Sequence, residues 1–198
     1  DDYDILRNEG RYFATIATGC ANEFEYSHFN ATVTINGDVV DDVDIRKKGF
    51  LGSLSASRPS FKLDFDELRP DRRFYGTRRM TLNNNLQDPS NTHTCMSYEL
   101  FREAGVPAPR CNFARVSVNG EDLGIYSHID SIKKLFLRRN FGNDTGNLYE
   151  AQIADFGENL KENFQLKTNK EVNDRSDLSA VVSALKATDE NLGSLLSQ

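Results

Sequence analysis

Hydrophobic and polar residues alternate in several stretches of the chain, which is the pattern of half-buried β-strands. Residues 32–35 and 39–45 alternate on either side of Asn36-Gly37, a dipeptide that favours the positive φ angles of a two-residue hairpin turn. Residues 113–118 and 123–126 repeat this arrangement around Asn119-Gly120. The pattern therefore predicts two antiparallel β-hairpins.

Two more strands are predicted between these hairpins. Within residues 60–65, Phe61, Leu63 and Phe65 fall on one face of a strand and Lys62 falls on the other. Residues 79–82 form a shorter candidate strand. The three asparagines at 83–85 are expected to end it, because their side chains compete for backbone hydrogen bonds.

Helical spacing replaces alternation in the remaining segments. An amphipathic helix is predicted over 90–104, before Gly105, and a short helix with a basic face over 132–141. A brief strand at 147–149 precedes helical spacing over 177–196, with a break near 189–191. The sum is an α+β fold: a β-rich region with one helix over 1–150, followed by the start of a helical region over 151–198.

Composition limits the classes of function. The chain has 198 residues, of which 38% are hydrophobic, enough for one core or two small ones. Its net charge is 24 − 30 = −6, which disfavours nucleic acid as a partner, because a protein that binds a duplex must present enough Lys and Arg to neutralise several phosphates. Its apolar runs are only a few residues long, against about 20 for a bilayer span, so no transmembrane segment is expected.

The cysteine count is odd. With Cys20, Cys95 and Cys111, either one thiol stays free or its partner lies outside the chain. Cys95 lies in the predicted helix and Cys111 follows the proline-containing break at 107–109, so a chain that folds back there brings the two together. The sequence leaves open whether they form a disulfide and whether Cys20 is paired.

The segment 46–62 is the main candidate for binding chemistry. Two predicted strands flank a loop containing glycine and serine, and Arg46, Lys48 and Lys62 stand at its ends. Backbone amides and cations in this arrangement suit a polyphosphate. The segment is not a Walker loop, because it lacks Gly-Lys-Ser/Thr and a following helix. The alternative is an exposed hairpin with solvated charges.

Other motifs in the sequence are weaker indications of function. Asp155-Phe156-Gly157 spells the metal-binding triplet of ordinary protein kinases, but the Asn required five residues after Asp130 is Leu135. The three histidines have no metal-ligand spacing, and no Gly-x-Ser-x-Gly nucleophile motif occurs. We therefore predict neither an ordinary kinase catalytic loop nor a metal site in this chain.

Several blocks in order resemble the CotH kinase family. They are Arg46-Lys47-Lys48-Gly49 and the segments 58–65, 82–90, 98–101, 105–110, 118–126 and 146–149. The version Lys-Lys-Gly-Phe-Leu-Gly-Ser-Leu-Ser at 47–55 is similar to that of secreted or surface-associated members.

This resemblance implies an atypical kinase whose small lobe is formed by the N-terminal hairpins. It further implies ATP and Mg²⁺ as cofactors, and transfer of the γ-phosphate to Ser or Thr of secreted, surface or spore-coat proteins. Arg46, Lys48 and Lys62 would then face the nucleotide phosphates. Glu99 would orient one of these cations, and Asp130 would lie near the adenine or ribose at the lobe junction.

The chain also departs from the family pattern. The catalytic and metal-binding aspartates of the family follow in tryptophan-containing segments, whereas this chain has no Trp and ends at Gln198. His93 stands where members commonly carry Arg. We therefore expect no catalytic residue within this chain, which would need the remainder of the kinase domain for activity. The alternative is a non-catalytic adhesion or binding module, and either protein would be secreted or at the cell surface.

Overall fold

The structure is a computed structural model that describes residues 1–10, 24–50, 52–151, 154–156 and 163–186. The chain divides into two compact units, Asp1–Ile132 and Lys133–Gln198. Each unit is described by itself. The predicted organisation, a β-rich lobe over 1–150 and a helical lobe from 151, stays a prediction.

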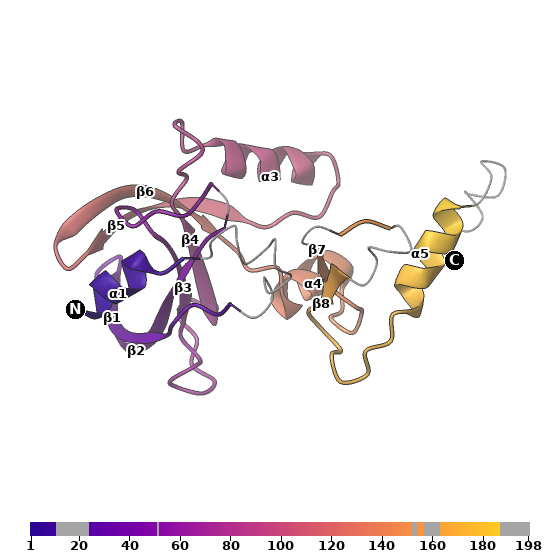
Figure 1. Cartoon of the computed structure of the whole chain (residues 1–198), viewed down its shortest axis with the longest axis horizontal. Helices are drawn as coiled ribbons and strands as arrows, with labels where there is room; N and C mark the ends of the chain where they lie inside the picture. The colour runs from indigo at the N-terminus through magenta and orange to yellow at the C-terminus, as the bar shows by residue number, and fades with distance from the viewer. Residues whose placement is uncertain (11–23, 51, 152–153, 157–162, 187–198) are drawn as a thin grey trace. The chain divides into compact units, whose positions relative to one another are not determined.

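The first unit is built on a six-stranded antiparallel sheet with the order β1-β2-β3-β4-β6-β5 (Figure 1). The strands are β1 (Phe29–Ile35), β2 (Asp38–Lys48), β3 (Ser60–Asp64), β4 (Arg79–Asn83), β5 (Cys111–Val118) and β6 (Glu121–Ile129). The predicted strands are thus confirmed. Strand β6 lies between β4 and β5. Strand β5, which follows helix α3 (His93–Glu103) in the sequence, therefore lies at the edge of the sheet.

Both predicted hairpin turns form as their residue types require. Asn36 and Gly37 have φ angles of 53° and 92°, and they join β1 to β2. Asn119 and Gly120, with φ angles of 50° and 85°, join β5 to β6. Asparagine and glycine adopt this left-handed region at the lowest steric cost, so they set the turn type.

One face of the sheet supplies the core of the first unit. The predicted apolar face of β3 is confirmed, since Phe61, Leu63 and Phe65 are each at most 4% exposed. Phe61 stacks on Tyr126 of β6 with ring centroids 6.1 Å apart. Burial in the apolar core raises the pKa of the Tyr126 hydroxyl, which donates a hydrogen bond to the carbonyl of Pro59.

A short helix, α1 (Asp2–Asn8), covers part of this core and was not predicted. Asp1 and Asp4 form a capping box at its N-terminus, and Leu6 is buried among the core residues. The helix is also tied to β2, because the Lys47 ammonium donates hydrogen bonds to two carbonyls just at its end. Seven residues with one buried apolar side chain leave too little periodicity to reveal a helix.

Helix α3 (His93–Glu103) confirms the predicted helix, but its apolar side is not buried. Met96 and Leu100 are each 65% exposed and Phe101 is 48% exposed. The helix is attached instead through polar and sulfur contacts. Cys95 forms a disulfide with Cys111 at the start of β5, and the Arg102 guanidinium donates to the carbonyl of Pro109.

Removal of the disulfide is therefore expected to release α3 from the sheet. The bond closes a loop with a sequence separation of 16 residues, for which the loss amounts to about 3 kcal/mol of stability. The double variant Cys95→Ser/Cys111→Ser should show rapid amide hydrogen exchange throughout α3, whereas the β2 and β3 amides keep their protection. Equal protection of α3 in the variant and the wild type would contradict this prediction.

The second unit contains α4 (Lys134–Phe141), β7 (Tyr149–Ala151), β8 (Phe164–Leu166) and α5 (Ser176–Leu185). The predicted helix over 132–141 is confirmed, and Gly142 ends it with a φ of 74°. The brief strand predicted at 147–149 lies two residues later and pairs with β8, which was not predicted. Helix α5 confirms the first part of the helical spacing predicted over 177–196, and the rest from 187 on, including the predicted break near 189–191, lies outside the described residues. The mixture of helices and antiparallel sheet confirms an α+β fold, and no helix of the described part is long and apolar enough to cross a bilayer.

Candidate functional site

The predicted phosphate-binding cations lie on adjacent strands, on the face of the sheet opposite the core. Arg46 of β2 is directly opposite Lys62 of β3. Lys48 is two residues beyond Arg46 on the same strand and therefore points to the same side. The register thus brings together Arg46, Lys48 and Lys62, which we call the cationic face.

Polar side chains of neighbouring strands surround the cationic face. The Lys48 ammonium donates a hydrogen bond to the Asn83 side chain at the end of β4. Lys62 is opposite Thr81 of β4. Asp64, the next outward residue of β3, accepts a hydrogen bond from Arg79 at 2.5 Å, so the nearby acidic charge is already paired.

The Arg46 side chain is also in contact with a histidine that precedes β1. Its guanidinium lies 3.4 Å from Nε2 of His28, and Nδ1 of the same ring lies 2.8 Å from Asp44. Asp44 is only 3% exposed. Sequence reasoning assigned no role to His28 or Asp44.

The loop between β2 and β3 is fixed by Asn84, which follows β4. Asn84 is 1% exposed, and its side-chain amide donates to the carbonyls of Ser53 and Arg58. Its backbone N–H donates to the Ser60 hydroxyl, and its side-chain oxygen accepts from the backbone of Leu86. The prediction that 83–85 ends a strand is confirmed, and the structure adds that Asn84 anchors this loop.

Arg58, at the end of this loop, packs against the sheet. Its guanidinium lies 5.2 Å from the ring centroid of Tyr126 and donates to the carbonyl of Ile125. A cation above an aromatic ring is attracted by the ring quadrupole. Arg58 therefore stabilises the fold of the loop.

The other two predicted binding residues have partners elsewhere. Glu99 of α3 accepts a hydrogen bond from Arg102 on its own helix. Asp130, directly after β6, accepts from the Arg110 guanidinium at 2.7 Å. Their predicted roles, orienting a cation and contacting the adenine or ribose, stay predictions.

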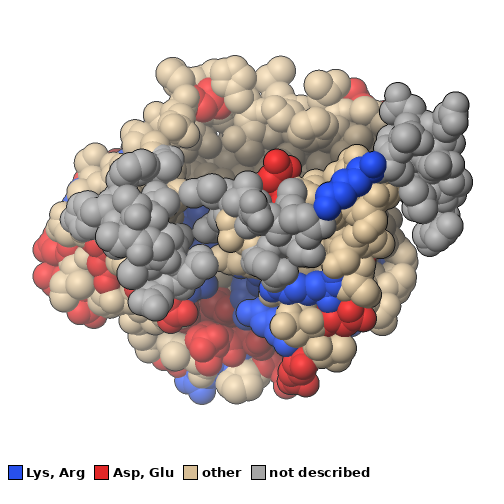
Figure 2. Space-filling view, turned by 45° about the vertical axis from the view of Figure 1, so that its right-hand side comes forward, with Lys and Arg blue, Asp and Glu red and all other residues tan. Residues whose placement is uncertain are grey.

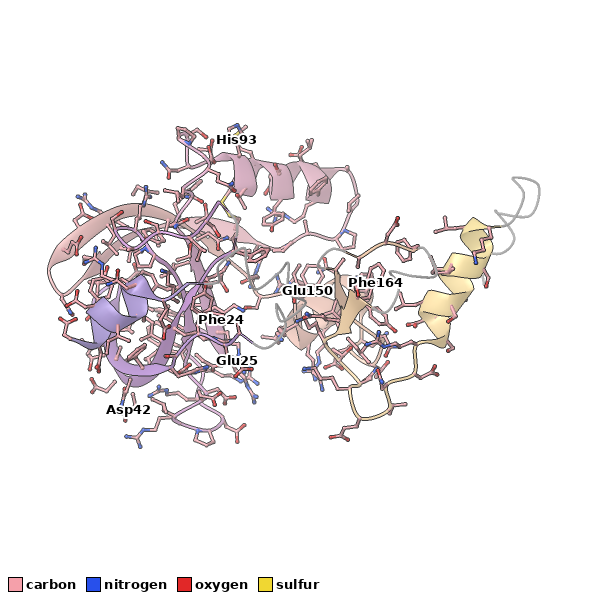
Figure 3. The ribbon with its side chains drawn as sticks, in the orientation of Figure 1. Phe24, Glu25, Asp42, His93, Glu150 and Phe164 are labelled. Atoms are coloured by element: carbon pink, nitrogen blue, oxygen red, sulfur yellow. A yellow bond between two sulfur atoms is a disulfide. The ribbon has the colours of Figure 1, made fainter. Side chains whose placement is uncertain are left out.

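The turn before α3 is organised by Asp88. One of its oxygens accepts hydrogen bonds from the Ser90 hydroxyl and from His93 Nδ1, and the other accepts from the His93 backbone N–H. These bonds, above all that of Ser90, lower the pKa of Asp88 to about 2. His93, labelled in Figure 3, is the first residue of α3. His93 thus helps to hold the start of α3.

This depressed pKa makes the stabilising effect of Asp88 dependent on pH. Its contribution should be complete above about pH 4 and should disappear as the pH falls towards 2. Thermal melting of the wild type and of Asp88→Asn should show a lower melting temperature for the variant at pH 7, and the difference should close between pH 4 and 2. A difference that is constant over this range would contradict the role of the charge.

In the second unit, the segment Gly146-Asn147-Leu148-Tyr149 anchors the start of α5. The Tyr149 hydroxyl donates to Asp177 at 2.6 Å, and the Asn147 amide donates to Asp177 and to the carbonyl of Asp174. Burial is the largest cause that raises the pKa of Tyr149, and the hydrogen bond to the Asp177 carboxylate is the second; the pKa is raised to about 12. This network gives the tyrosine and asparagine of the segment a structural role.

Loss of the Tyr149 hydroxyl should weaken this anchor. Tyr149→Phe removes the hydrogen bond to Asp177 and keeps the ring contact with Phe164, so we expect a loss of about 1 kcal/mol in stability. Urea denaturation measures it. Tyr75→Phe is the control, because it removes the same kind of bond, to Asp38, from a tyrosine that is 68% exposed and should therefore cost much less. An unchanged midpoint for Tyr149→Phe would contradict the role of the network.

The described residues contain no group of three His, Cys, Asp or Glu side chains placed to hold a metal ion. Acidic and basic side chains are interspersed on the face of the molecule seen in Figure 2. Among the described residues, the cationic face is the candidate site for phosphate groups.

The first unit thus combines two features. An antiparallel sheet carries Arg46, Lys48 and Lys62 on the face opposite its core, and a disulfide holds helix α3 to the edge strand β5. A family model described as CotH kinase protein matches residues 45–195, which include the cationic face and most of both units. The chain belongs to this family.

A curated relative extends the comparison. Inner spore coat protein H of Bacillus subtilis (strain 168) is 29% identical over 98 residues. The match covers 50% of this chain and 26% of the relative. The chain thus spans about a quarter of the length of this relative.

Proposed function

We propose that this chain is the nucleotide-binding part of an ATP-dependent protein kinase that phosphorylates Ser or Thr of secreted, surface or coat proteins. Membership of the CotH kinase family supports kinase chemistry, and the spore-coat relative supports an extracellular or coat substrate. The single observation that carries the proposal for this chain is the register of Arg46 opposite Lys62, with Lys48 on the same face.

The cationic face suits a triphosphate for an electrostatic reason. Phosphoryl transfer spreads negative charge over the phosphate oxygens, and fixed cations stabilise this charge without reorganising. Two of the three cations face each other on paired strands, so the sheet fixes the spacing of their backbones. Glu99 and Asp130 complete the proposed site, as the partner of a cation and as a contact of the adenine or ribose.

Mg²⁺ would neutralise the bound triphosphate, and we propose that the carboxylates that hold it belong to the remainder of the kinase domain, outside this chain. Without those carboxylates we expect the 198-residue chain to bind ATP and to transfer no phosphate. The remainder of the kinase domain is therefore its first proposed partner, and a secreted or surface protein is the second.

The decisive assay is transfer of label from γ-labelled ATP by the protein expressed from its whole gene. Lys62→Ala should abolish most of the incorporation, whereas Lys170→Ala, which removes an exposed lysine of the second unit, should leave it intact. Absence of incorporation by the wild type would remove the kinase proposal, and equal incorporation by Lys62→Ala and the wild type would remove the role of the cationic face.

An adhesion or binding module is the second candidate, and the exposed apolar side of α3 favours it. Met96, Leu100 and Phe101 present apolar surface of the kind that often marks an interaction site. This candidate predicts protein binding without ATP hydrolysis or transfer. Loss of partner binding in Met96→Ser/Leu100→Ser, together with absent phosphoryl transfer in the wild type, would favour the module over the kinase.

A further inference from the structure

We propose that His28, held by Asp44, is a positioning residue that fixes the Arg46 guanidinium for the phosphate groups of the nucleotide. This inference rests on the proposed function and deepens it. Arg46 is opposite Lys62 on the cationic face, and a long arginine side chain reaches a defined position only when a neighbour restrains it.

The hydrogen-bonding roles of the imidazole follow from its partners. A guanidinium has only donors, so Nε2 of His28 must accept from Arg46, across 3.4 Å. The proton of the neutral ring is then on Nδ1, which donates to the two oxygens of Asp44 at 2.9 and 2.8 Å. The tautomer that donates from Nδ1 to Asp44 is therefore the same one that can accept at Nε2 from Arg46.

The Asp44 carboxylate, which orients the His28 ring, is held in place by burial. Asp44 is 3% exposed, and it lies within β2, paired with Asn30 and Asp64 of the neighbouring strands. A buried carboxylate requires a hydrogen-bond donor, which His28 supplies. The His28 side chain is 46% exposed and thus presents its other nitrogen towards the outer end of Arg46.

An irregularity of the first hairpin brings the histidine to this position. Near the turn, Ile35 pairs with Asp38, and the register shifts by one residue between Ala31 and Val33. After the shift Phe29 pairs with Ile45, so the residue before Phe29 stands next to Arg46. Because a one-residue slip moves side chains to the other face, the unshifted hairpin would separate His28 from Arg46.

Two substitutions separate the two ends of the imidazole. His28→Asn keeps a donor at the depth of Nδ1 for Asp44 and is too short to reach Arg46. His28→Gln keeps an acceptor at the depth of Nε2 for Arg46. His93→Asn is the matched control, because Nδ1 of His93 also bonds an aspartate, 2.7 Å away at Asp88, outside the cationic face.

The readout is the dissociation constant of the full chain for ATP and for adenosine, measured by titration calorimetry. We expect His28→Asn to weaken ATP binding about three- to tenfold, the value of one typical hydrogen bond, and to leave adenosine binding unchanged. His28→Gln and His93→Asn should remain within about twofold of the wild type.

A double-mutant cycle distinguishes positioning from a general structural effect. If His28 acts through Arg46, then His28→Asn has no further effect on ATP affinity in the Arg46→Ala background. An equal loss in both backgrounds, or wild-type affinity for His28→Asn, would overturn this inference while leaving the proposed function intact. If His28→Asn does not fold, a folded His28→Gln with more than about threefold weaker ATP binding would overturn it. Failure of the wild-type chain to bind ATP would remove the proposed function itself.

Discussion

Lys62→Glu is expected to weaken ATP binding by the chain about 100-fold or more. The substitution removes a charge-assisted hydrogen bond to phosphate, worth about 1.5–3 kcal/mol, and puts an acidic side chain beside the triphosphate. Lys62 projects from the face of β3 opposite the core and is exposed, so the charge reversal leaves packing intact. Its partner across the strand pair, Arg46, would then face an acidic residue.

Titration calorimetry with ATP measures this effect, and Lys170→Glu is the control. Lys170 is an exposed lysine of the second unit, so its reversal changes the net charge by the same amount. Since salt screens exposed charges beyond about 8–10 Å, the control should change affinity by less than about twofold. Similar losses for both variants would mean that only net charge matters and would contradict a local site.

Asn84→Ala is expected to have the largest effect on stability, a loss of about 2–4 kcal/mol. The substitution leaves two partly buried carbonyls, those of Ser53 and Arg58, without their side-chain donor and removes the acceptor of the Leu86 N–H. The loop between β2 and β3 would lose its anchor. ATP affinity should fall as well, because this loop connects the strands that carry Lys48 and Lys62.

Urea denaturation and limited proteolysis measure this prediction. We expect a lower unfolding midpoint for Asn84→Ala and new cleavage between residues 49 and 59. Asn112→Ala, at an exposed asparagine within β5, is the control and should stay within about 0.5 kcal/mol of the wild type. A variant with the wild-type midpoint and an uncleaved loop would contradict the anchoring role of Asn84.

The sheet could be predicted because its signals are local. Alternation along β3 separates Lys62 from Phe61 and Leu63, and two Asn-Gly dipeptides fix the hairpins. The same local signals put Arg46 and Lys62 on neighbouring strands. The candidate cations were therefore predictable as a set, although what they bind stays a proposal.

The side of α3 that meets the sheet could not be predicted, for a physical reason. Periodicity places Met96 and Leu100 on one side of the helix, and burial of that side is the usual outcome. Here a covalent bond from Cys95 and the contacts of Arg102 hold the opposite side to the sheet. Apolar spacing alone carries no information about such attachments.

The contacts of His28 depend on an equally hidden feature. Its approach to Asp44 and Arg46 requires the register shift within the first hairpin. In β2 this irregularity coincides with Asp42, which has a φ of 53° and is labelled in Figure 3. An aspartate in an alternating stretch is compatible with a regular strand or with a bulge, so the sequence does not distinguish the two registers.

The most direct test of the central claim is a crystal structure of the protein expressed from its whole gene, bound to Mg²⁺ and a non-hydrolysable ATP analogue. The account predicts phosphate oxygens within hydrogen-bonding distance of Arg46 and Lys62, with the adenosine directed towards Asp130. A nucleotide bound with its phosphates away from the cationic face would contradict it.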